Sequence, residues 1–233
     1  MNISPSRPGL TGNQLKIIAL ITMTIDHVGM MLFPRVSILR AIGRIAFPIF
    51  AYMIAEGCQH TRNRKKYLLS MVFLAAVCQV VYFFAMGSLS MCVLVTFSLS
   101  IGLIYLADYA HTGGRFGTAV LFAAGCGLFF LCYLAHDVLF PKTDFGIEYG
   151  LFGVLLPVFA HLGERKQKKL QYFSAGLALL NLTWGGIQWF SMAAIPLISL
   201  YNGKRGKYKM KYLFYVYYPL HLVVIHFLKI LLA

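Results

Sequence analysis

Long apolar runs separated by short polar loops dominate this sequence from residue 15 to residue 232. A helix that crosses a lipid bilayer needs about 20 predominantly apolar residues. Because the bilayer core holds no water, backbone polar groups there must be satisfied within the spanning structure, and uninterrupted runs of this length favour helices over a barrel. The sequence therefore predicts an all-α fold, a polytopic membrane helix bundle.

Nine candidate transmembrane helices can be delimited, at 15–33, 40–58, 67–86, 91–108, 116–136, 147–163, 170–183, 187–201 and 212–232. The seventh and eighth are short, and Trp184-Gly185-Gly186 between them is either a tight turn or a re-entrant tip, so eight spans are the alternative. We expect one integral membrane domain, 1–233, since this length suits a single domain. No cleavable signal peptide is expected, because the opening residues are polar.

The composition agrees with a lipid environment. Charged residues make up 12% of the chain and hydrophobic residues 59%, whereas soluble domains carry roughly a quarter charged residues. The formal net charge of +14 comes from cations in short loops, so topology explains it and no nucleic-acid partner is expected. The cysteines have no C-x-x-C spacing, so we expect no metal site and predict that they pack as small hydrophobes.

Loop charges predict the orientation. Lys and Arg gather in the loops at 62–66, 165–169 and 204–211, whereas the loops at 86–89 and 184–186 carry no charge. Because basic loops stay in the cytoplasm, nine spans would place the N-terminus in the cytoplasm and the C-terminus outside. Arg35 and Arg40 are the exception, since they would face outside.

Ionisable side chains inside the apolar runs are the first candidates for function. A charge at bilayer depth costs at least about 2.5–3.5 kcal/mol on insertion scales, so such residues are rarely incidental. Asp26 and His27 lie together in the first run, while Arg40 and Arg44 share one face of the second. Asp26 is the obvious partner for Arg44. A buried ion pair that only fixes the packing of two helices is the alternative, and both can hold.

Two further groups carry polar side chains. Lys204 and Arg205 follow the turn residues Asn202-Gly203 and are suited to phosphate, although topology alone explains such cations equally well. Tyr218 and His221 are three residues apart, so a phenol and an imidazole would lie on one helix face. Tyr149, in Glu148-Tyr149-Gly150, is a weaker candidate at the start of a helix.

These residues fall within motifs that resemble the TraX family. The matching motifs are Leu15-Lys16-x-Ile18-Ala19, Asp26-His27-x-Gly29, Gly43-Arg44-x-Ala46-Phe47-Pro48, Glu56-Gly57, Thr61-Arg62, Tyr149-Gly150-x-x-Gly153, Tyr201-Asn202-Gly203 and Phe214-Tyr215-x-x-Tyr218-Pro219-x-His221-Leu222. They cover nearly the whole chain in matching order, and the stretch from the third to the fifth run matches mainly in hydrophobicity.

The resemblance implies acetyl transfer in a bacterial cytoplasmic (inner) membrane. The family's founding member is associated with N-terminal acetylation of conjugative pilin. The family is also similar to transmembrane acyltransferases that use cytoplasmic acyl-CoA and a suspected intramembrane histidine. By motif position that histidine is His27 here, with Asp26 and Arg44 orienting the site. The partners implied are membrane lipid, acetyl-CoA as acyl donor, and an unknown acceptor such as a pilin-like peptide.

Substrate and donor binding is expected at Arg40, Glu56, Arg62, Tyr149, Asn202, Lys204, Arg205, Tyr218 and His221. Arg44 or Tyr218 would steady the developing oxyanion. Direct transfer and a covalent acetyl-histidine are both open, as are N- and O-acetylation. The rival functions are a proton-coupled carrier and a non-catalytic assembly partner for surface appendages.

Overall fold

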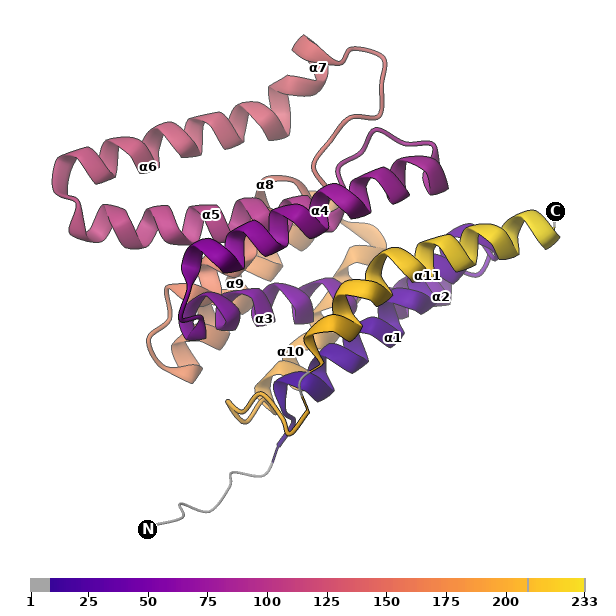
Figure 1. Ribbon diagram of the computed structural model, residues 1–233, viewed down its shortest axis with the longest axis horizontal. Helices are drawn as coiled ribbons and strands as arrows, with labels where there is room; N and C mark the ends of the chain where they lie inside the picture. The colour runs from indigo at the N-terminus through magenta and orange to yellow at the C-terminus, as the bar shows by residue number, and fades with distance from the viewer. Residues whose placement is uncertain (1–8, 209, 233) are drawn as a thin grey trace.

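The structure is a computed structural model that describes residues 9–208 and 210–232 (Figure 1). Residues 1–8, at the polar start of the chain, and residue 209, in the third basic loop, lie outside the described part. The described residues form α1 (Gly12–Met31), α2 (Ser37–Gly43), α3 (Ala46–His60), α4 (Arg64–Met86), α5 (Val93–Thr112), α6 (Gly114–Phe129), the π-helical turn η1 (Phe130–Leu134), α7 (Ala135–Leu139), α8 (Gly150–His161), α9 (Lys166–Trp184), the 3₁₀ segment η2 (Gly186–Ala193), α10 (Ala194–Ser199) and α11 (Lys211–Leu232). The prediction of an all-α fold is confirmed for them.

Within the described ranges, five helical stretches are long and apolar enough to cross a membrane: Ser37–His60, Arg64–Met86, Val93–Thr112, Gly114–Leu134 and Leu213–Leu232. They correspond to five of the nine predicted runs. The other four runs are also helical, but α8 and the η2–α10 segment are short and α1 and α9 carry more polar residues. The chain is therefore treated as a helical membrane protein, and the count of nine spans stays a prediction.

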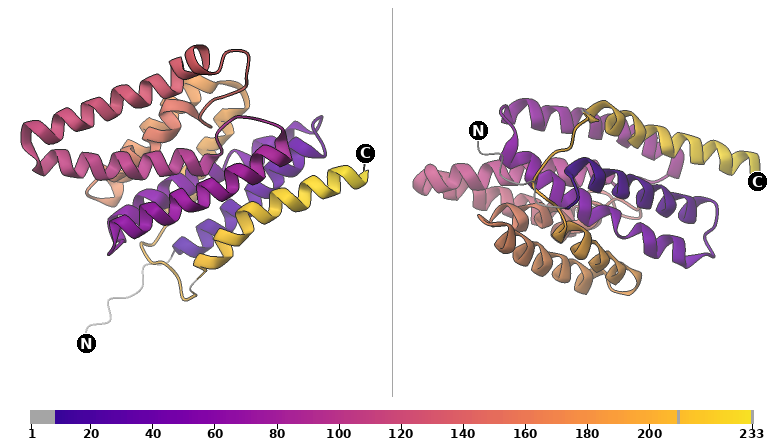
Figure 2. Two further views of the ribbon diagram at one scale, coloured as in Figure 1. Left: turned by 45° about the horizontal axis from the view of Figure 1, so that its top comes forward. Right: turned by 90° about the horizontal axis from the view of Figure 1, so that it is seen from below.

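The helix α3 lies at the centre of the bundle, in contact with α1, α5 and α8. In the most apolar window of Ser37–His60, 61% of the residues are buried, against 11% in Gly114–Leu134. The latter stretch forms the edge of the molecule next to α5 (Figure 1). On the opposite side, α11 runs beside α1 and α4, as both views in Figure 2 show.

The cysteines follow this division between centre and edge. Cys58, Cys78 and Cys92 are buried, as predicted for packing residues. For Cys126 the prediction is wrong, because α6 turns most of its surface outward and leaves this side chain exposed.

The second apolar run is interrupted at Arg44-Ile45, between α2 and α3. The N–H of Arg44 still donates to the carbonyls of Arg40 and Ala41, at 3.2 and 3.3 Å, so Arg44 caps the C-terminal end of α2. Pro48 lies in the first turn of α3, where a missing N–H costs no helical bond. The helix break therefore lies about one turn before Pro48, and the Arg44 side chain at the break reaches Asp26 of α1.

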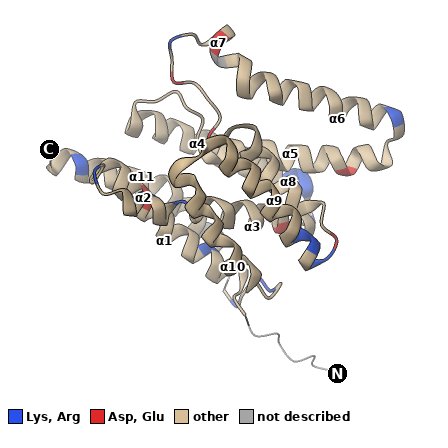
Figure 3. Cartoon of the chain, turned by 180° about the vertical axis from the view of Figure 1, so that it is seen from behind, with Lys and Arg blue, Asp and Glu red and all other residues tan. Residues whose placement is uncertain are grey.

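The three basic loops meet at one end of the bundle, which we call the basic end. Lys and Arg lie mostly in loops and at helix ends (Figure 3). Three hydrogen bonds tie the basic end together: Gln59 Nε2 to the His161 carbonyl at 3.3 Å, Lys166 Nζ to the Ser199 carbonyl at 2.6 Å, and Gly12 N–H to the Lys204 carbonyl at 2.8 Å. This is the segregation that the positive-inside rule requires. That the basic end faces the cytoplasm stays a prediction.

Candidate functional site

The predicted site residues divide into two groups at different depths. The first, which we call the central cluster, comprises Asp26, His27, Arg40, Arg44, Tyr149, Tyr218 and His221. The second lies toward the basic end and comprises Glu56, Arg62, Asn202, Lys204 and Arg205. Since an α-helix rises about 1.5 Å per residue, His27 lies about 22 Å along α1 from Gly12 at the basic end.

Asp26 joins two arginines inside the bundle. Its Oδ2 accepts from Arg40 Nη1 at 2.7 Å, and both of its carboxylate oxygens accept from Arg44 Nη2 at 2.7 Å. Only 13% of the Asp26 side chain and 12% of the Arg44 side chain are exposed. The predicted pairing of Arg44 with Asp26 is confirmed, and Arg40 adds a second cation. A Cβ at Gly43 would overlap the Asp26 side chain, which explains the glycine before Arg44.

Arg44 also reaches across to two other elements. Its Nη1 lies 3.5 Å from the Tyr149 hydroxyl and 3.4 Å from Gln188 Oε1, in η2. Arg44 Nε and Gln188 Nε2 are buried donors that no described residue pairs. A buried donor without an acceptor costs about 1–3 kcal/mol, so such groups call for an explanation. A carbonyl or carboxylate oxygen of a ligand would satisfy them.

Tyr149 is held in an uncommon backbone conformation. Its φ is 63°, in the left-handed region that bulky residues rarely adopt. Its ring stacks on Phe47 with centroids 3.8 Å apart, and a side chain at Gly153 would collide with it. Strain of this kind persists where the surroundings fix the residue, and it is concentrated at functional sites. The stacking therefore keeps the phenol of Tyr149 beside Arg44.

His27 is paired with His221 of α11. His27 Nδ1 lies 2.9 Å from the Met23 carbonyl, and His221 Nδ1 lies 3.0 Å from the Tyr217 carbonyl. Because a carbonyl only accepts hydrogen bonds, both Nδ1 atoms carry hydrogen, and the neutral His27 ring has its lone pair on Nε2. His221 Nε2 approaches His27 Nδ1 at 3.4 Å. The geometry leaves His27 Nε2 with the electron pair that a base or a nucleophile needs.

Two tyrosines of α11 support this histidine pair. Thr24 Oγ1 donates to the Leu20 carbonyl at 2.8 Å, so it accepts from the Tyr217 hydroxyl, which lies 2.7 Å away. The Tyr218 ring is buried against His221, edge to face, with centroids 5.6 Å apart. The predicted shared face of Tyr218 and His221 is thus present, and its His221 meets His27 of α1.

At the basic end, some predicted binding residues have partners within the protein. Glu56 Oε1 lies 2.5 Å from Lys169 Nζ, and this ammonium also contacts Gln59. Asn202 Nδ2 donates to the Gly9 carbonyl at 3.1 Å, and its Oδ1 accepts from the Lys204 N–H at 2.9 Å. These contacts give Glu56 and Asn202 roles in holding the fold.

The cationic side chains at this end are different. Those of Arg62, Lys204 and Arg205 are exposed. They are therefore accessible to an anionic ligand, although their place in basic loops suits topology as well.

The sequence is similar to a known protein family and to known proteins. Residues 11–229 match the family model described as TraX protein. The chain belongs to the TraX family. This TraX-family protein is 27% identical to the "Probable fimbrial assembly protein FimC, serogroup H1" of Dichelobacter nodosus, over 91% of this chain and 93% of that protein.

A 38-residue stretch is 55% identical to an uncharacterised protein of Rickettsia prowazekii (strain Madrid E), and it covers 16% of this chain and 15% of that protein. No solved structure shows a significant match.

Sequence reasoning missed several polar residues of this TraX-family protein. Gln188 is the clearest, since a lone amide in an apolar run is the kind of residue that the cost of burial singles out. Lys169 was attributed to loop charge alone. Asp108 and His161 were expected to reach water from helix ends, but Asp108 accepts from Arg64 at 2.8 Å and lies 2.9 Å from His161 Nε2.

Proposed function

We propose that this TraX-family protein is a membrane-embedded acyltransferase that moves an acetyl group from cytoplasmic acetyl-CoA to an amine or hydroxyl acceptor. The supporting observation is the central cluster, where His27 Nε2 has its lone pair in the same part of an apolar bundle as two unpartnered donors, Arg44 Nε and Gln188 Nε2. A base beside donors for a developing oxyanion is what acyl transfer requires.

In the proposed reaction, His27 Nε2 takes the proton of the acceptor as the acceptor nitrogen or oxygen attacks the thioester carbonyl. The carbonyl oxygen becomes an oxyanion, which the N–H donors of Arg44 and Gln188 stabilise. The C–S bond then breaks, the acetyl group stays on the acceptor, and the CoA thiolate takes the proton from the His27 imidazolium. Asp26 holds Arg44 in place, so it is a positioning residue.

The donor would enter from the basic end. The exposed cations Arg62, Lys204 and Arg205 suit the phosphates of CoA. Because His27 lies about 22 Å along α1 from Gly12, the thioester arm would have to thread into the bundle to bring the acetyl group to the central cluster.

A non-catalytic role in assembly is the second candidate, and the name of the Dichelobacter nodosus relative favours it. The same name supports a pilin-like peptide as acceptor if the protein is catalytic. A carrier is the third reading, since buried ionisable groups also line ion pathways. His27→Gln separates acyl transfer from the assembly role, because acyl transfer depends on an imidazole at this position and an assembly contact does not.

The test is acetyl release from labelled acetyl-CoA by the purified protein in detergent, with and without a pilin N-terminal peptide. We expect slow CoA release by the wild type and at least a 100-fold loss in His27→Gln, the typical contribution of general base catalysis. The matched control is His226→Gln, because His226 lies on α11 and contacts the Ala85 carbonyl instead of the central cluster. Equal release by wild type and His27→Gln, or no binding of acetyl-CoA by either, would refute the transferase.

A further inference from the structure

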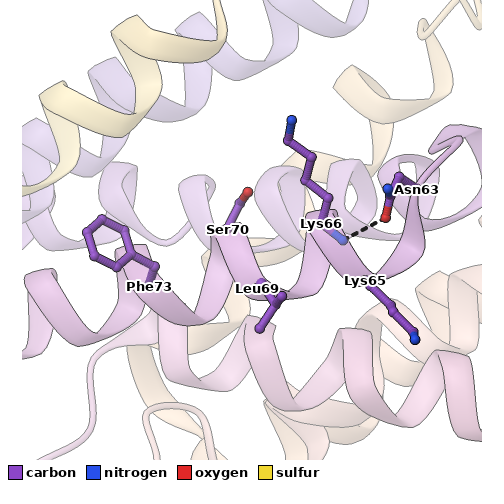
Figure 4. Close-up of a pocket in the computed structure, with 6 residues that line it drawn as sticks. All are labelled: Asn63, Lys65, Lys66, Leu69, Ser70 and Phe73. Carbon is purple, nitrogen blue, oxygen red and sulfur yellow. Dashed lines mark hydrogen bonds between the residues drawn. The ribbon is translucent and has the colours of Figure 1, made fainter.

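A groove on the outer surface of the bundle begins on the first turns of α4 and continues between α4 and α11. It consists of two adjoining hollows of about 520 and 550 Å³, which share Ser70 and Phe73. The hollow nearer the basic end is lined by Asn63, Lys65, Lys66, Leu69, Ser70 and Phe73 (Figure 4). The groove therefore starts at a basic loop and continues along a helix long enough to cross a membrane.

Polarity changes along the groove in one direction. Lys66, Ser70, Phe73 and Val77 follow one another at spacings of four, three and four residues, which places them on one face of α4. Figure 4 shows Lys66 and Ser70 pointing to the same side of this helix. The face thus begins with an ammonium, passes a hydroxyl and ends in apolar side chains.

The second hollow is almost entirely apolar. Phe73 and Val77 of α4 face Val216, Pro219 and Val223 of α11 across it. From Lys66 to Val77 the helix rises about 16 Å, roughly half of a hydrocarbon core of about 30 Å. The groove therefore has the length of one leaflet.

We propose that this groove binds one anionic phospholipid, with its phosphate on Lys66 and an acyl chain along Phe73, Val77 and Val223. The charges select the head group, because Lys65 and Lys66 are both exposed at the polar mouth and a zwitterionic lipid would bring its own cation to them. The apolar hollow suits the acyl chain of the lipid. This site lies on the opposite face of α11 from His221, so it stands independently of the transferase proposal.

The first part of the test concerns the head group and uses the full chain, delipidated in detergent. The protein is titrated with palmitoyl-oleoyl phosphatidylglycerol or phosphatidylcholine, and native mass spectrometry counts the bound lipid. We expect phosphatidylglycerol to bind more tightly. The double variant Lys65→Gln/Lys66→Gln should weaken its binding by about 25-fold, since each basic residue near a membrane surface contributes about fivefold. Lys168→Gln, an exposed lysine of another basic loop, is the matched control and should change nothing.

The second part of the test concerns the acyl chain and uses neighbouring valines of α11. Val223→Trp should fill the apolar hollow and lower phosphatidylglycerol binding at least 10-fold, whereas Val224→Trp, on the exposed face, should not. Elution as one species and an unchanged Tm show that each variant is folded. Any one of four results would overturn the proposal. The first two are equal binding of the two lipids and unchanged phosphatidylglycerol binding in the double lysine variant. The other two are a loss of binding in Lys168→Gln as large as in the double variant, and equal effects of the two tryptophan substitutions.

Discussion

Neutralising Asp26 tests whether the central cluster depends on charge. Asp26→Asn keeps the size of the side chain and removes the negative charge that faces Arg40 and Arg44 at 2.7 Å. Removing one partner of a buried ion pair costs about 3–5 kcal/mol, because the remaining charge stays buried without compensation. Arg40 is 28% exposed and can rehydrate in part, so we expect a loss near the lower limit, about 3 kcal/mol of the free energy of unfolding.

The two arginines should differ in the same measurement. Arg40→Gln leaves Asp26 paired with Arg44, so the loss should be about 1–2 kcal/mol, near the value of one charge-assisted hydrogen bond. Combining Asp26→Asn with Arg44→Gln removes the stranded charge, and the double variant should be more stable than the sum of the two single effects predicts.

Equilibrium unfolding in mixed micelles, followed by circular dichroism, gives these free energies. Glu164→Gln is the matched control, because this exposed carboxylate lies at the basic end and its removal should change stability by less than about 0.5 kcal/mol. Two results would show that the central cluster is not a buried group of compensating charges. One is a free energy of unfolding for Asp26→Asn within about 1 kcal/mol of the wild type. The other is a larger loss of unfolding free energy in Arg40→Gln than in Asp26→Asn.

Two further predictions concern packing, one at the central cluster and one toward the basic end. Gly43→Ala should cost about 1–3 kcal/mol of stability in the same assay, because the added Cβ would displace the Asp26 side chain. Gly102→Ala is the control, since a Cβ there meets nothing within 4 Å, and it should be neutral or stabilising. Equal effects of the two variants would contradict the close approach of Gly43 to Asp26. Lys169→Met should cost about 3 kcal/mol because it strands the buried Glu56 carboxylate, and Lys168→Met, at an exposed neighbour, should stay within about 0.5 kcal/mol. A similar Tm for both lysine variants would show that the Glu56 pair does not stabilise the fold.

Local patterns in the sequence predicted much of the fold and part of the site. Apolar length predicted helices, and the cost of a buried cation predicted that Arg44 needs Asp26, eighteen residues away across one hairpin. Both arguments work because helical periodicity and desolvation act over short stretches of chain. The functional role of these residues stays a prediction.

Contacts between distant segments could not be predicted in this way. His27 and His221 are separated by 194 residues, and no spacing rule relates them. Gln188 reaches Arg44 only because η2 returns to the centre after the turn at Gly185. The helix break beside Arg44 also escaped prediction, because residues 40–58 were expected to form one helix.

The two ends of α1 are completed by parts of the chain that are made last. The N–H groups of Gly12 and Asn13 donate to the carbonyls of Lys204 and Arg205 at 2.8 and 2.9 Å, while His27 meets His221 near the other end. A ribosome therefore releases the first helix long before its partners exist, and closing so long a loop is entropically costly. During membrane insertion the N–H groups of Gly12 and Asn13 therefore lack these acceptors, and His27 lacks His221. The site forms only after α11 has been synthesised.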